Sequence, residues 1–73
     1  MSFEEWVGRV RLAVSGLTDL DRTEWIVMFT WTAIRAAERG EFSDRDFRNG
    51  VALLARLSYG ETPPPEWWED RQA

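Results

Sequence analysis

The clearest pattern of chemically active side chains is a row of three arginines, Arg45, Arg48 and Arg56. At about 100° per residue of a helix, they fall within a stripe about 80° wide. Guanidinium groups along one helix face suit bidentate contacts with phosphate or carboxylate groups. The row leaves three interpretations open: an ordinary solvated face, a contact with an acidic protein partner, or a helix-turn-helix-like contact with nucleic acid.

Groups that commonly carry catalysis are absent from this sequence. It has no His, no Cys and no Lys, which removes the commonest general base, the thiol nucleophile and the Schiff-base amine. The carboxylates show no paired or metal-ligating spacing, and the five glycines are isolated rather than gathered in a phosphate-binding loop. We therefore expect no enzymatic activity, no cofactor, no metal site and no small-molecule substrate.

The charge balance weighs against nucleic acid as the partner. The net charge is −4, and residues 61–73 carry −3 of it, so residues 1–60 are nearly neutral, with nine acidic residues against eight arginines. A domain that binds nucleic acid is expected to present a basic surface. We expect a protein partner, with a nucleic-acid contact through the arginine row as the alternative.

Length and composition predict one small domain in the cytoplasm. A chain of 73 residues supports one core, and 17 residues are Leu, Ile, Val or Phe, which is enough for the chain to fold. Without Cys there is no disulfide, no apolar stretch reaches the roughly 20 residues that a bilayer requires, and the first residues lack the positive charge of a secretory signal. All nine basic residues are Arg, which is typical of GC-rich coding sequences and indicates a bacterial or phage origin.

A helix-start signal occurs three times along the chain. An apolar residue precedes a capping Ser or Asp, an acid stands three residues after the cap, and an aromatic residue follows the acid. The caps and their acids are Ser2 with Glu5, Asp21 with Glu24, and Ser43 with Asp46. Gly16, Gly40 and Gly60 mark the corresponding ends. We predict helices at 3–15, 22–39 and 44–59, no strand, and hence an all-α three-helix bundle over residues 1–60.

Apolar stripes on these helices indicate one shared core. On the first helix the stripe runs from Phe3 to Leu17, and on the third it runs from Phe47 to Ser58 with Leu53 at its edge. We expect a core that contains Trp6, Val10, Phe29, Phe47, Val51 and Leu54.

The middle helix differs from its neighbours because it has two apolar sides. Trp25, Phe29 and Ala36 lie on one side, whereas Val27, Trp31 and Ile34 recur at spacings of four and three on the opposite side. Either the third helix covers this second side, which would make Trp31 part of the core, or a second copy or a foreign partner covers it.

Residues 61–73 are predicted to form an acidic tail that carries prolines and tryptophans. Pro63, Pro64 and Pro65 favour polyproline II, and adjacent tryptophans point apart on a helix, so one should pack on the bundle and the other should remain for a partner. With the two-sided middle helix, this predicts a non-catalytic protein-interaction module: a small regulator, adaptor or phage-type inhibitor, with a homodimer as a further option. The candidate partner-binding residues are Leu12, Val27, Trp31, Ile34, Arg45, Arg48, Arg56, Trp67 and Trp68.

Overall fold

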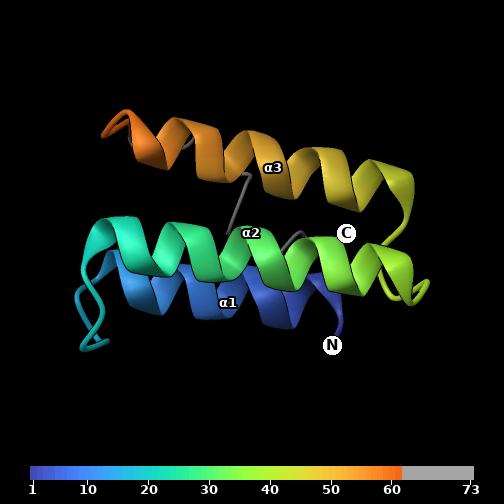
Figure 1. Cartoon of the computed structure of the whole chain (residues 1–73), viewed down its shortest axis with the longest axis horizontal. Coiled ribbons are helices and arrows are strands. Elements are labelled where there is room, and N and C mark those ends of the chain that lie inside the picture. Colours follow the sequence, from blue (N-terminus) through green and yellow to red (C-terminus); the bar gives the residue numbers. More distant parts are fainter. Residues whose placement is uncertain (62–73) are drawn as a thin grey trace, which may run out of the picture.

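Three helices form the part of the chain that the computed structural model describes, residues 1–61. They are α1 (Phe3–Val14), α2 (Arg22–Glu38) and α3 (Asp44–Ser58). Successive helices run in opposite directions, and α2 contacts both of its neighbours, with the larger contact against α3 (Figure 1). No strand occurs within residues 1–61. The predicted all-α three-helix bundle is therefore confirmed, with helix bounds within one residue of those expected.

Each helix begins at the predicted capping residue. At α1, Ser2 Oγ accepts a hydrogen bond from the Glu5 backbone N–H (3.1 Å), and Glu5 Oε1 accepts one from the Ser2 N–H (3.2 Å). Asp21 and Glu24 form the same reciprocal box at α2. At α3, Ser43 Oγ accepts from the Asp46 N–H (3.0 Å), and only this half of the box forms at that helix. Asp is one methylene shorter than Glu, so it reaches back less well.

Each helix ends in a Schellman motif at the predicted glycine. The N–H groups of Gly16 and Leu17 donate to the carbonyl oxygens of Ala13 and Leu12, and the same pair of bonds closes α2 and α3. The three glycines have φ angles of 79°, 75° and 78°, a left-handed conformation that strains any residue with a Cβ. Because these signals are local, the ends of the helices follow directly from the sequence.

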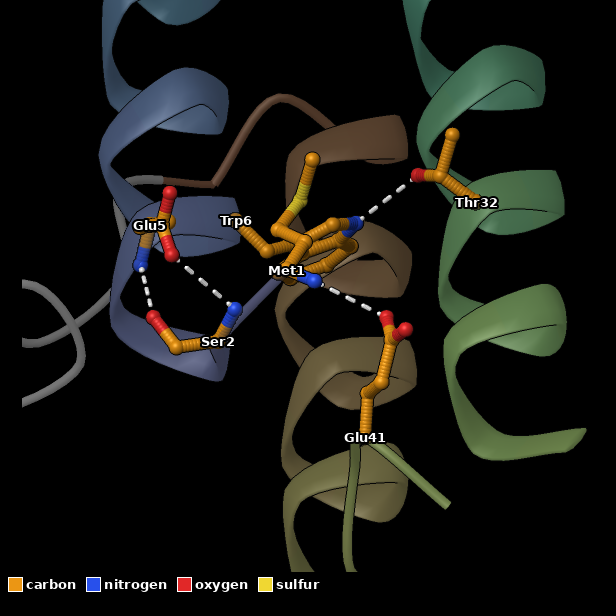
Figure 2. Close-up of polar contacts among 6 residues, drawn as sticks. All are labelled: Met1, Ser2, Glu5, Trp6, Thr32 and Glu41. Atoms are coloured by element: carbon orange, nitrogen blue, oxygen red, sulfur yellow. Dashed lines mark hydrogen bonds and ion pairs between the residues drawn. The ribbon is translucent and has the colours of Figure 1, made fainter. Parts of the chain in front are cut away.

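Trp6 lies at the centre of the core and contacts all three helices. Its side chain is fully buried, and its indole N–H donates to Thr32 Oγ1 (2.9 Å) on α2 (Figure 2). The indole nitrogen also lies 3.3 Å from the Phe29 carbonyl oxygen. The ring of Phe29 meets it edge-on at a centroid distance of 6.0 Å. On α3, a Cβ built at Gly50 would lie 3.2 Å from the six-membered ring of Trp6. The bundle therefore closes around one indole whose polar atom is satisfied.

The predicted core is correct for most of its members and wrong for Val51. Four of the six expected side chains are buried, and Phe47 packs against them while remaining partly exposed. Val51 is 41% exposed, whereas Leu53, expected at the edge of the stripe, is fully buried. The reason is that α3 presents Gly50 to the Trp6 ring, and Val51 lies about 100° around the helix from Gly50.

The end of the α1 stripe is also less buried than expected. Val14 and Leu17 were expected to face the core, yet both are exposed. Val14 is the last residue of α1, and Leu17 follows the helix end in the connection to α2. At this end of α1 the core therefore stops at Ala13, which is buried.

Candidate protein-interaction surface

Four exposed apolar side chains lie together on one side of α2. Val27 is 63% exposed, Trp31 is 57% exposed, and Met28 and Ile34 are 40% and 36% exposed. At about 100° per residue, all four fall within about 60° on either side of Trp31. We call Val27, Met28, Trp31 and Ile34 the α2 face.

The opposite side of α2 is the one that the bundle buries. Trp25, Phe29, Ala33 and Ala36 are buried there against α1 and α3. The interpretation in which α3 covers Trp31 is therefore wrong, because α3 packs on the other side of α2. Neither α1 nor α3 therefore covers the α2 face.

A short row of polar contacts borders the α2 face. The Arg35 guanidinium carbon lies 5.5 Å from the centroid of the Trp31 ring, a cation–π geometry. Arg35 Nε lies 3.8 Å from Glu38 Oε1, in an ion pair whose two side chains are both largely exposed. Such a pair contributes little to stability.

Met28 and Arg35 belong to this surface although the sequence pattern did not single them out. Met28 lies three residues before Trp31 and Arg35 lies four residues after it, so both are neighbours of Trp31 on the helix surface. The helical spacing from Trp31 is the signal that could have identified them.

The arginine row lies on the outer side of α3. Arg45, Arg48 and Arg56 are all exposed, whereas Gly50, Leu53, Leu54 and Leu57 are buried on the opposite side of the helix. The helix-turn-helix interpretation also requires α2 and α3 to cross at about 90–120°. Instead, the two helices lie side by side in antiparallel directions (Figure 1).

The remaining candidate residues lie outside α2. Leu12 is exposed on α1 and has Val14 as an exposed apolar neighbour along the chain. Tyr59, which the sequence pattern did not select, is exposed after the end of α3. Trp67 and Trp68 lie outside the described residues, as does nearly all of the predicted tail.

Within residues 1–61, two carboxyl groups have shifted pKa values, and both have structural partners. Hydrogen bonds with the backbone and side chain of Ser2 lower the pKa of Glu5. The N-terminal ammonium group, 2.9 Å from Glu41 Oε1, lowers the pKa of Glu41 (Figure 2). Both are stabilised in the ionised form, which suits a cap and an ion pair rather than a general acid. Within the described part of the chain, no three acidic residues gather in a group that could hold a metal ion.

A search of protein-family models, of characterised proteins and of solved structures finds no match to this chain. Among the helices of residues 1–61, none combines the length and the apolar character needed to cross a membrane. The surface of the bundle is therefore the part of the molecule that bears on function.

Proposed function

We propose that this chain is a non-catalytic protein-interaction module, a small regulator, adaptor or inhibitor that binds a larger protein through the α2 face. One observation carries the proposal: Trp31 exposes more than half of its side chain, and the exposed side chains of Val27, Met28 and Ile34 surround it on one side of α2. Single exposed apolar residues are normal on a protein surface, but a contiguous group with a central tryptophan is typical of a binding site.

The composition of the α2 face supports a protein as the ligand. Trp and Arg are enriched among the residues that dominate binding energy at protein interfaces, and Met is enriched at interfaces generally. Here Trp31 is flanked by Met28 on one side and by Arg35 on the other. A partner that covers these side chains would bury a large aromatic ring together with the stem of the arginine beside it.

Binding and folding can be separated at this position. Because Trp31 lies outside the core, Trp31→Ala should leave the helical content and the melting temperature of the bundle nearly unchanged. Loss of a central interface tryptophan costs about 2 kcal/mol or more of binding free energy, which weakens binding by about 30-fold.

Capture experiments test this proposal. The tagged wild-type chain, Trp31→Ala and the control Leu12→Ala, which removes an exposed apolar residue from α1, would each be incubated with lysate of the source organism. We expect wild type and Leu12→Ala to retain the same specific protein and Trp31→Ala to lose it. Equal capture by all three folded variants would contradict the proposal.

Binding of nucleic acid through Arg45, Arg48 and Arg56 is the second candidate. The exposure of all three on the outer side of α3 favours it. The near neutrality of residues 1–60 and the antiparallel packing of α2 and α3 weigh against it. If the row binds phosphates, affinity for duplex DNA should fall steeply with salt, by about one log–log slope unit per contact.

A further inference from the structure

We infer that the partner presents an amphipathic α-helix to the α2 face, and that basic side chains of this helix pair with Glu24 and Glu38. The inference rests on the proposed function and names the chemistry of its partner. It is carried by the order of charged and apolar residues along α2 and by their exposure.

The exposed side of α2 has the spacing of a coiled-coil seam. Glu24, Val27, Trp31, Ile34 and Glu38 are separated by three, four, three and four residues, which is the alternation that lets one helix pack along another. All five are exposed. The two glutamates lie seven residues from Trp31 on either side, or about 10 Å along the helix axis. The seam therefore has an apolar centre and a carboxylate at each end.

This charge order disfavours a second copy of the chain as the occupant. In a parallel pair in register, Glu24 would face Glu24 of the other copy, and Glu38 would likewise face itself. In an antiparallel pair, placing Trp31 opposite Val27 sets Ile34 against Glu24, and placing Trp31 opposite Ile34 sets Val27 against Glu38. Among the five seam residues, each of these arrangements places a carboxylate against another carboxylate or against an apolar side chain, and both contacts are unfavourable.

Both glutamates retain capacity for a partner's cation. Glu24 Oε1 accepts the Asp21 N–H at 3.2 Å, and a carboxylate has about four acceptor positions on its two oxygens. The contact of Glu38 with Arg35 is long, at 3.8 Å, and the Glu38 side chain is 66% exposed. A Lys or Arg at each end of a partner helix would add an ion pair at both ends of the seam.

Two matched peptides test the inference. Both are fluorescein-labelled helical peptides of about 20 residues, which is about 30 Å long, and both have the same row of leucines facing the seam. At the positions that face Glu24 and Glu38, one peptide carries Lys and the other carries Glu. Fluorescence anisotropy would measure their binding to the whole chain. We expect the lysine peptide to bind about tenfold more tightly at low salt, and this preference should shrink at about 1 M salt, where the Debye length is about 3 Å.

Variants of the chain test whether the preference for the lysine peptide depends on Glu24 and Glu38. Glu24→Gln with Glu38→Gln should abolish the preference for lysine while keeping binding, because Gln retains an oxygen that can accept the capping bond. Trp31→Ala should lose both peptides. Glu4→Gln with Glu61→Gln, which removes two exposed carboxylates outside α2, should keep the full preference. Circular dichroism would verify that each variant is folded.

Three results would overturn the inference. The first is equal or no binding of the two peptides by the wild-type chain. The second is a dimer in sedimentation analysis that Trp31→Ala dissociates, which would make a second copy the occupant. The third is tighter peptide binding after Trp67→Ala with Trp68→Ala, which would make the C-terminal segment of this chain the occupant. If the Trp31-dependent capture of a protein persists while the peptides fail, the helical partner alone is refuted; if both fail, the proposed function is refuted as well.

Discussion

Gly50 and Gly8 form a matched pair that measures how tightly Trp6 is held. Both glycines lie inside helices, so replacing either by Ala gains about 0.5–1 kcal/mol of helix propensity. At Gly8, which is exposed, a new Cβ would meet nothing within 4 Å. At Gly50, the new Cβ would lie 3.2 Å from Trp6 Cη2 and Cζ3, and 3.5 Å from Phe3 Cε1.

The packing term at Gly50 should exceed the gain in propensity. Optimal carbon–carbon contacts are about 3.5–4.0 Å, so the indole or α3 must move by a few tenths of an ångström. Trp6 has little freedom to move, because it is fully buried, bonded to Thr32 and enclosed by aromatic rings. Overpacking of this kind costs about 1–3 kcal/mol, which leaves Gly50→Ala destabilised by about 0–2.5 kcal/mol after the gain in propensity.

Urea unfolding followed by circular dichroism would compare both variants with wild type. We expect Gly8→Ala to raise the free energy of unfolding by about 0.5–1 kcal/mol and Gly50→Ala to lower it. The difference between the two variants, about 1–3 kcal/mol, is the packing term. If Gly50→Ala stabilises the chain as much as Gly8→Ala does, Trp6 is not held tightly against α3.

Two further predictions concern substitutions in the core and the loss of stability at low pH. Leu53→Ala should lower the free energy of unfolding by about 2–5 kcal/mol and Val51→Ala by less than about 1 kcal/mol, because only Leu53 is buried. The opposite order in urea unfolding would contradict an orientation of α3 in which Leu53 faces the core and Val51 faces outward. The pKa values of Glu5 and Glu41 are lowered in the folded state, so their stabilisation is present above the unfolded value of about 4.3 and is lost as the pH falls through the folded values. Melting temperatures should decline below about pH 4.3, and less steeply in Glu5→Gln with Glu41→Gln; an unchanged slope would show that other carboxyl groups dominate.

The helices could be predicted from sequence because their boundaries depend on neighbouring residues. Ser2 with Glu5 and Asp21 with Glu24 need only three residues to form their boxes. Glycines at the helix ends act through their own φ angles. These interactions do not depend on how the helices pack against one another.

Which side of α3 faces the core, and how far the core extends along α1, could not be predicted in the same way. An apolar stripe limits which side of α3 faces inward, but Val51 and Leu53 lie near its two edges, and the indole of Trp6 against Gly50 decides between them. The two apolar sides of α2 were visible as spacings in the sequence. Which side the bundle leaves exposed, with Trp31 on it, is a property of the packing of three helices together.

Photo-crosslinking at single positions tests the role of the α2 face most directly. A benzophenone side chain would be placed at Val27, on the α2 face, or at Val51, an exposed valine on α3, in the source organism. We expect a specific adduct with another protein from position 27 and none from position 51. Identical adducts from both positions, or adducts from position 27 that contain only copies of this chain, would contradict this expectation.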